Sequence, residues 1–112
     1  MPEQLIIIKI KDIEEINKLF TSVILLHQGL DAIYSSCLYY NSKKEQICNI
    51  FLNLIKGHYF VDGNKRTSVV VLLSLIALNN MSSKLTDENL FDITIKIAES
   101  HFLVEHVLNL IF

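Results

Sequence analysis

Residues 57 to 78 read GHYFVDGNKRTSVVVLLSLIAL, and they divide into a polar loop and an apolar segment. After its first turn, the segment from Asn64 to Leu78 contains almost only apolar residues and no residue that breaks a helix. A helix that is hydrophobic on most of its sides is buried on most of its sides. The stretch therefore predicts a central buried helix over residues 64–78, closed by Asn79 and Asn80.

The segments before and after this helix also have helical patterns. Ser42 and Glu45 have the spacing of a capping box, and an apolar stripe follows them up to Gly57. Asp12 and Glu15 have the same spacing ahead of another apolar stripe. Thr86, followed by Asp87 and Glu88, is expected to cap a later helix. Besides the central helix, we expect helices over residues 13–29, 31–39, 43–57, 87–99 and 101–111.

Length and composition limit the fold to one domain. The 112 residues, 51% of them hydrophobic, are enough for one core and too few for two. Residues 5–10 are rich in β-branched side chains and predict a short strand or an extended arm. The sequence therefore predicts an all-α fold, a single domain over residues 1–112 with a compact bundle of about five or six helices. Further core residues are expected at Phe91, Phe102, Phe112 and the two unreactive thiols Cys37 and Cys48.

Charge and hydropathy exclude several classes of partner. The formal net charge of −2 at pH 7 provides no basic surface for nucleic acid. The uninterrupted apolar runs are far shorter than the about 20 residues that span a membrane. The start Met-Pro-Glu-Gln has no basic leader, so a secretory signal is not expected. We expect a cytoplasmic protein that contacts neither nucleic acid nor membrane.

The polar loop ahead of the central helix carries more chemistry than a connection needs. The first N–H groups of a helix have no intrahelical partner, and together with the helix dipole they favour a bound phosphate. Gly63 allows a ligand to approach the backbone closely. Lys65 and Arg66 would add positive charge there, Arg66 as a bidentate donor and Lys65 as a point charge.

Two further loop residues suggest a reaction. Asp62 would repel a phosphate unless a divalent cation lay between them, and one carboxylate with phosphate oxygens is how Mg²⁺ is usually held. His58 is the one loop residue that exchanges a proton near neutral pH, so it could activate a hydroxyl. The alternatives are a capping or core histidine at 58, a simple N-cap at Asp62, and solvated cations at the helix start, although cations there oppose the dipole. Phe60 is expected to hold the loop against the core.

The stretch resembles the motif H-x-F-x-D/E-G-N-x-R of the Fic/Doc family. Its six specified positions are all filled here, and the resemblance extends from Ile10 over nearly the whole chain. It implies an ATP-dependent transferase with Mg²⁺ as cofactor and with roles by position. His58, Lys65 and Arg66 would be catalytic, Asp62 would hold the metal, and the nucleotide would be bound by Asp62, Gly63, Asn64, Lys65 and Arg66.

The variable position of the motif distinguishes the two chemistries of the family. AMP-transferring Fic enzymes usually have Gly there and a second Arg three residues after the first, whereas Lys65 and Val69 occupy these positions here, as in Doc-type toxins. The Doc branch implies a kinase that phosphorylates a threonine of elongation factor Tu and halts protein synthesis. The chain has no match to the inhibitory motif of Fic enzymes, which implies a separate antitoxin of the Phd type.

Two other readings remain open. The same loop could serve AMP or other nucleotidyl transfer to a protein hydroxyl. Doc-like chains also carry a longer Gly-, Pro-, Arg- and Asp-containing segment between their first two helices, where this chain has only Leu26 to Asp31. That departure is compatible with the other alternative, an inactive Fic-fold protein that only binds.

Overall fold

The computed structural model describes residues 4–21 and 29–112, and these ranges contain helices and no strand. The fold class is therefore all-α, as predicted. No helix in the described ranges has the length and apolar character needed to cross a membrane. The elements are α1 (Ile10–Lys18), α2 (Leu30–Ser36), the 3₁₀ turn η1 (Cys37–Tyr39), α3 (Lys43–Lys56), α4 (Asn64–Leu78), α5 (Asp87–Glu99) and α6 (Val104–Ile111).

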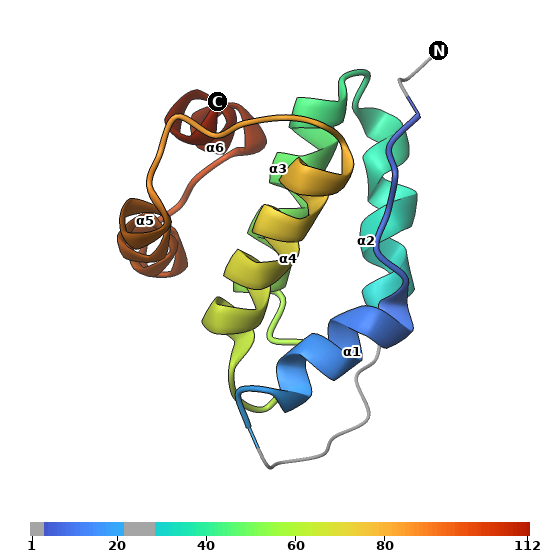
Figure 1. Ribbon diagram of the computed structural model, residues 1–112, viewed down its shortest axis with the longest axis vertical. Coiled ribbons are helices and arrows are strands. Elements are labelled where there is room, and N and C mark those ends of the chain that lie inside the picture. Colours follow the sequence, from blue (N-terminus) through green and yellow to red (C-terminus); the bar gives the residue numbers. More distant parts are fainter. Residues whose placement is uncertain (1–3, 22–28) are drawn as a thin grey trace.

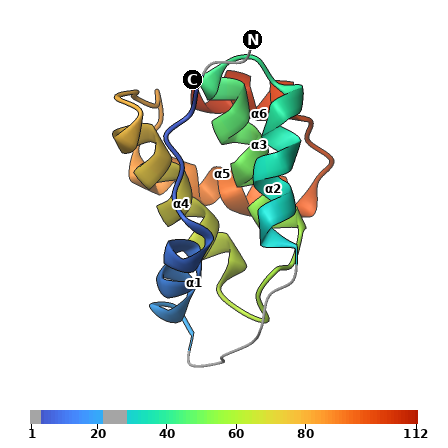
Figure 2. The same ribbon diagram turned by 90° about the vertical axis from the view of Figure 1, so that its right-hand side faces the viewer.

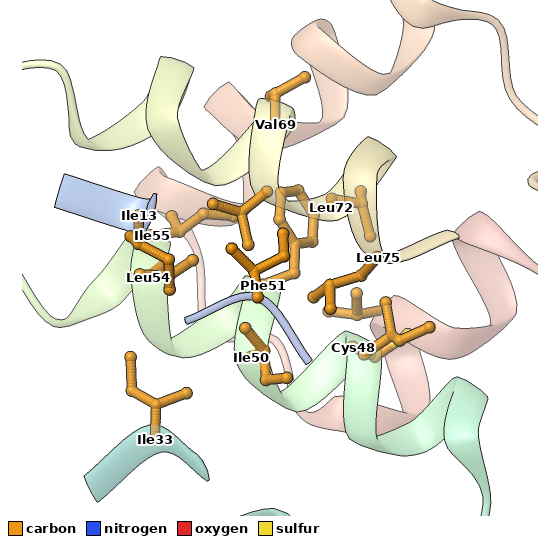
Figure 3. Packing of buried hydrophobic residues seen from close by; sticks show 14 of the residues in the cluster. Ile13, Ile33, Cys48, Ile50, Phe51, Leu54, Ile55, Val69, Leu72 and Leu75 are labelled. Atoms are coloured by element: carbon orange, nitrogen blue, oxygen red, sulfur yellow. The ribbon is translucent and has the colours of Figure 1, made fainter. Parts of the chain in front are cut away.

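The centre of the molecule is the pair α3 and α4, which run side by side (Figure 1). α2 packs against α3 on one side, α5 and α6 cover the other side, and α1 lies across the end at which α4 begins (Figure 2). Between α3 and α4 the side chains of Phe51, Leu72 and Leu75 are fully buried (Figure 3). The prediction of a central buried helix is confirmed, with both bounds of α4 as expected.

The caps of α3 and α5 follow from the sequence. The Ser42 hydroxyl accepts a hydrogen bond from the Glu45 N–H at 3.1 Å, and the Thr86 hydroxyl accepts one from the Asn89 N–H at 3.2 Å. Each bond satisfies one of the N–H groups that a helix start leaves unpaired. Both helices therefore begin where the polar capping residue was predicted.

The N-terminal segment before α1 is an extended arm and not a strand. The Asn79 side chain holds it at both polar groups of one residue: its Oδ1 accepts from the Ile6 N–H at 2.9 Å, and its Nδ2 donates to the Ile6 carbonyl at 2.9 Å. The same Nδ2 donates to the Leu75 carbonyl at 2.8 Å, which closes α4. Further along the arm, the Tyr34 hydroxyl donates to the Ile8 carbonyl. Asn79 thus ends the central helix and fastens the arm across it.

The first helix differs from its prediction. It begins at Ile10 with Lys9 at the N-cap and no side-chain cap, so the expected capping box at Asp12 is wrong. It also ends at Lys18 instead of Gly29, because tight turns follow, in which the Phe20 N–H donates to the Asn17 carbonyl at 2.9 Å. The rest of that prediction, over residues 22–28, lies outside the described residues.

The last helix also starts later than expected, at Val104 instead of His101. The ring nitrogen Nδ1 of His106 accepts from the Leu103 N–H at 3.0 Å, and this bond fixes the chain just before the helix. The second helix is close to its prediction, with its final turn tightened into η1.

Both cysteines are free and buried, as predicted. Burial, together with the nearby Glu45 carboxylate, raises the pKa of the Cys48 thiol to about 12. Burial also raises the pKa of Cys37. The folded protein therefore keeps both thiols protonated at a pH at which an unfolded chain, with an ordinary thiol pKa of about 8.5, loses those protons.

This difference predicts an alkaline loss of stability. The unfolded chain binds fewer protons above about pH 8.5, so the free energy of unfolding should fall by about 1.5 kcal/mol between pH 8.5 and pH 10 through Cys48 alone. Urea unfolding of the native protein and of Cys48→Ala at several pH values measures this slope. An equal slope in both proteins would contradict the account.

The bonds of Asn79 predict a second effect on stability. Asn79→Ala leaves the Ile6 main chain without its partners, and we expect the free energy of unfolding to fall by about 2 kcal/mol. The Ile6 amide should also exchange its hydrogen faster. Asn89→Ala, at an exposed helical position, is the matched control and should change stability by less than about 0.5 kcal/mol. An Ile6 amide still protected in Asn79→Ala would contradict the role of this side chain.

Candidate active site

The loop that joins α3 to α4 is shaped first by Gly57. Its N–H donates to the Asn53 carbonyl at 2.7 Å, and a Cβ at this position would collide with the ring of Tyr59, which folds back over it. His58 then has φ +49°, in the left-handed region that residues other than glycine seldom adopt. Such backbone persists only where the surroundings impose it, and it is frequent at functional sites. The ring of Tyr59 is thus packed inward while His58 is exposed.

A second element of the loop is a clamp between Phe60 and Asn64. The Asn64 Oδ1 accepts from the Phe60 N–H at 3.1 Å, and the Asn64 Nδ2 donates to the Phe60 carbonyl at 2.7 Å. The Phe60 side chain is 7% exposed and belongs to the core, so its predicted role in holding the loop is confirmed. The amide of Asn64 shapes the loop, which leaves its main-chain N–H as the group available to a ligand.

The end of α1 supports the loop from the other side. Asn17 is 5% exposed, and its Nδ2 donates to the Asp62 carbonyl at 2.9 Å and to the Thr67 Oγ1 at 3.1 Å. Gly63 has φ +75°, and a Cβ there would lie 3.2 Å from the Asn17 Nδ2 and from the Phe20 Cβ. Asn17 was not predicted as a site residue from the sequence. The signal available was a lone amide at the helical spacing of i+4 from the buried Ile13.

A pocket of about 540 Å³ opens beside this loop, within the range of small-ligand sites. Phe20, Val61 and residues of α5 contribute apolar and polar side chains to its wall. The structure brings together at this one pocket all of the residues that the sequence singled out: His58, Asp62, Gly63, Asn64, Lys65 and Arg66.

The charged side chains that the structure describes at the pocket form no ion pairs with one another. Among the described residues the one ion pair joins Lys18 to Glu15, so the exposed Asp62, Lys65 and Arg66 have no salt-bridge partner there. The interpretation of Asp62 as a simple N-cap is wrong, because Gly63 occupies the N-cap of α4 and no side chain caps it. The carboxylate of Asp62 is therefore free to meet a ligand.

The start of α4 also offers main-chain donors. Its first helical bond runs from the Thr67 N–H to the Gly63 carbonyl at 2.9 Å, so the three preceding N–H groups have no intrahelical acceptor. They lie at the positive end of a helix of 15 residues. Donors, dipole and the two cations of this turn together favour an anion.

The donor set fits a magnesium ion only in the company of a ligand. The described residues contain no cluster of three or more His, Cys, Asp or Glu side chains that could hold a metal by themselves. Mg²⁺ is commonly bound by one or two carboxylates plus substrate phosphates, and Asp62 provides such a carboxylate at the pocket. The residues present therefore fit Mg²⁺ that arrives with a phosphorylated ligand.

Several pocket residues were not predicted as site residues, among them Phe91, Glu99 and Lys56. Phe91 is 38% exposed and lines the pocket, so its interpretation as a core residue is wrong, whereas Phe102 and Phe112 do pack against the core. Glu99 lies on the same face of α5, eight residues on. Lys56 Nζ donates to the Ala98 carbonyl at 3.2 Å and to the Ser100 carbonyl. This ammonium caps the C-terminal end of α5.

The clamp between Asn64 and Phe60 generates a test of the loop. Asn64→Ala removes both hydrogen bonds, and we expect the free energy of unfolding to fall by about 1 to 2 kcal/mol. Asn64→Asp keeps the acceptor and adds a negative charge at a helix start, so it should lose less. Thermal and urea unfolding compare the two. An Asn64→Ala protein as stable as the native one would show that the clamp contributes nothing.

One comparison with known proteins gives a match, and the match is to a protein family. No curated protein and no solved structure matches the chain. The family model described as Fic/DOC family matches residues 9–76, which include α1, α2, α3, the loop and most of α4. That match covers more than half of the 112 residues and ends before α5. The chain therefore belongs to the Fic/DOC family.

Proposed function

We propose that this protein is a Doc-type toxin of a toxin–antitoxin system, with Mg²⁺-dependent phosphoryl transfer from ATP to a Ser or Thr hydroxyl of a protein target. Membership of the Fic/DOC family supports a protein-modifying activity in general. The observation that carries the finer proposal is the gathering of the six candidate site residues between His58 and Arg66 at one pocket, with the start of α4 open to it.

The phosphate chain of the nucleotide binds at the start of α4. The free N–H groups of the first turn donate to its oxygens, and Arg66 and Lys65 add charge-assisted bonds from side chains that no carboxylate of the described residues neutralises. Mg²⁺, held by Asp62 and phosphate oxygens, would neutralise charge on the phosphates and help to align them. Positioning and charge stabilisation provide most of the catalysis in phosphoryl transfer.

His58 acts as the general base. Its neutral imidazole accepts the proton of the target hydroxyl while the hydroxyl oxygen forms a bond to the γ-phosphorus. The bond between that phosphorus and the β,γ-bridging oxygen breaks, and ADP leaves. The exposed position of His58 beside the pocket allows a hydroxyl on another protein to reach it.

The position of Val69 favours phosphoryl over nucleotidyl transfer. AMP-transferring relatives carry a second Arg here, whereas this Val is 9% exposed and belongs to the core cluster (Figure 3). It provides no charge for a further phosphate group. The single cationic pair of Lys65 and Arg66 then suits a nucleotide whose terminal phosphate lies nearest to the acceptor hydroxyl.

The proposed partners follow from the same branch of the family. The target is a translation elongation factor of the Tu type, whose modification inhibits protein synthesis in the cytoplasm. An antitoxin of the Phd type restrains the activity. Large apolar side chains that are exposed on this chain, such as Leu38 and Tyr39, are available to such a protein partner.

Intact mass of elongation factor Tu after incubation with the protein, ATP and Mg²⁺ tests this function. We expect a gain of one phosphoryl group, reduced about 10²- to 10⁴-fold in rate by His58→Asn. Asn is the suitable replacement because it tolerates the left-handed backbone at this position, and His101→Asn, at an exposed histidine that does not line the pocket, is the matched control.

Each other outcome has a definite meaning. A gain of one AMP group would replace the kinase by a nucleotidyl transferase. An unchanged mass would exclude this target, and a cell lysate would then be labelled with ATP carrying ³²P at either the γ or the α position. Labelling of no protein from either nucleotide would refute a transferase and leave a Fic-fold binding protein.

A further inference from the structure

Asn17 is buried beneath the phosphate-binding turn and does not line the pocket. We propose that it is a positioning residue: it fixes the peptide between Asp62 and Gly63 so that the Gly63 N–H donates to the bound phosphate chain. This inference rests on the proposed function, because it assigns a role at the same nucleotide site.

The Asn17 side chain contacts both the loop and α4. One N–H of the Asn17 amide is bonded to the Asp62 carbonyl and the other to the Thr67 hydroxyl, so the side chain spans the loop and the first turn of α4. Asn17 is 5% exposed; its bond to Thr67 is buried and its bond to the Asp62 carbonyl is partly buried. A buried amide with two donors used holds the loop carbonyl more firmly than a solvated one could.

The orientation of the Asp62–Gly63 peptide follows from this contact. In a planar trans peptide the C=O and N–H bonds point in opposite directions. Holding the Asp62 carbonyl against α1 therefore directs the Gly63 N–H away from α1. The Gly63 N–H has no acceptor among the described residues, and Gly63 lines the pocket together with the first turn of α4. It thus adds one donor to those of the helix start.

The Asp62–Gly63 peptide needs a contact that fixes its orientation. The two common β-turn types differ mainly in a flip of their central peptide, and a glycine after that peptide permits either orientation. Asp62 is exposed, so its own side chain does not oppose the flip. Without the Asn17 bond, the Asp62–Gly63 peptide is free to turn its N–H away from the phosphate.

The sequence allows the main-chain N–H of Gly63 to be observed on its own. It contains three glycines, preceded by Gln28, Lys56 and Asp62, so ¹³C-carbonyl aspartate with ¹⁵N-glycine labels a single Asp–Gly peptide bond. Its NMR signal reports the Gly63 N–H alone. Sodium tripolyphosphate with Mg²⁺ serves as the titrant because it presents phosphates without a base or sugar.

The variants separate positioning from structural support. Asn17→Leu removes both bonds at similar volume, whereas Thr67→Val removes only the bond to α4 and leaves the Asp62 carbonyl held. We expect the Gly63 signal of the native protein and of Thr67→Val to shift on saturation with tripolyphosphate. In Asn17→Leu the shift should be lost and binding should weaken about tenfold. The ¹⁵N signals of Gly29 and Gly57 report whether each variant is folded.

The outcomes distinguish this inference from the proposed function. If the native protein binds no tripolyphosphate, the phosphate site and the proposed function fall together with the inference. If it binds and the Gly63 signal does not respond, the inference alone is wrong, even where Asn17→Leu does not fold. Equal weakening by Thr67→Val and Asn17→Leu would show that Asn17 supports the fold without orienting the peptide.

Discussion

The unpaired N–H groups at the start of α4 are the constraint on which the rest of the structure depends. A helix buried along most of its length must end somewhere, and its first turn leaves donors that need acceptors. Here the N-cap is Gly63, which has no side chain to supply one. The protein instead places this turn at a pocket, where an anionic ligand can provide the missing acceptors.

Leaving a helix start uncapped requires that the chain before it be held by other means. Asparagine side chains do this on both sides of the turn: Asn64 bonds the Phe60 main chain, and Asn17 bonds the Asp62 carbonyl. Asn79 holds the N-terminal arm in the same way. The primary amide carries donor and acceptor together, so it can replace a missing main-chain partner. These side chains thus hold irregular segments of the chain in place against the helices, and the helices themselves need not be longer.

The sequence predicted correctly the features that depend on interactions between residues close together in the chain. The bounds of α4 and the caps at Ser42 and Thr86 depend on residues within one turn of each other, and they were predicted correctly. The site residues from His58 to Arg66 also lie within nine positions, so their approach to one pocket required little tertiary information. The predicted end of α1 was wrong, and the Asn17 side chain near this end bonds Thr67, which is 50 residues away along the chain and could not be paired with it from a local pattern.

Long-range contacts also explain the residues that were missed. Asn17 was missed because its acceptor, the Asp62 carbonyl, is 45 residues away along the chain, and Phe91 was predicted as core because no local pattern places α5 at the pocket. Neither position has a short motif. The i+4 spacing from Ile13 marks Asn17 as buried, but the identity of its acceptor is a property of the packed structure alone.

The pocket has two walls of different character, and this division bears on what the site can select. The wall from the loop and α4 lies within residues 9–76, which the family model matches, whereas Phe91, Ala98 and Glu99 of α5 lie beyond it. The Glu99 carboxylate on the α5 wall would repel a phosphate, whereas Lys65 and Arg66 on the other wall would attract it. What meets the α5 wall should therefore be the uncharged part of a ligand or a target side chain. The family match therefore covers the residues of the first wall alone, and the second wall is built from residues beyond it.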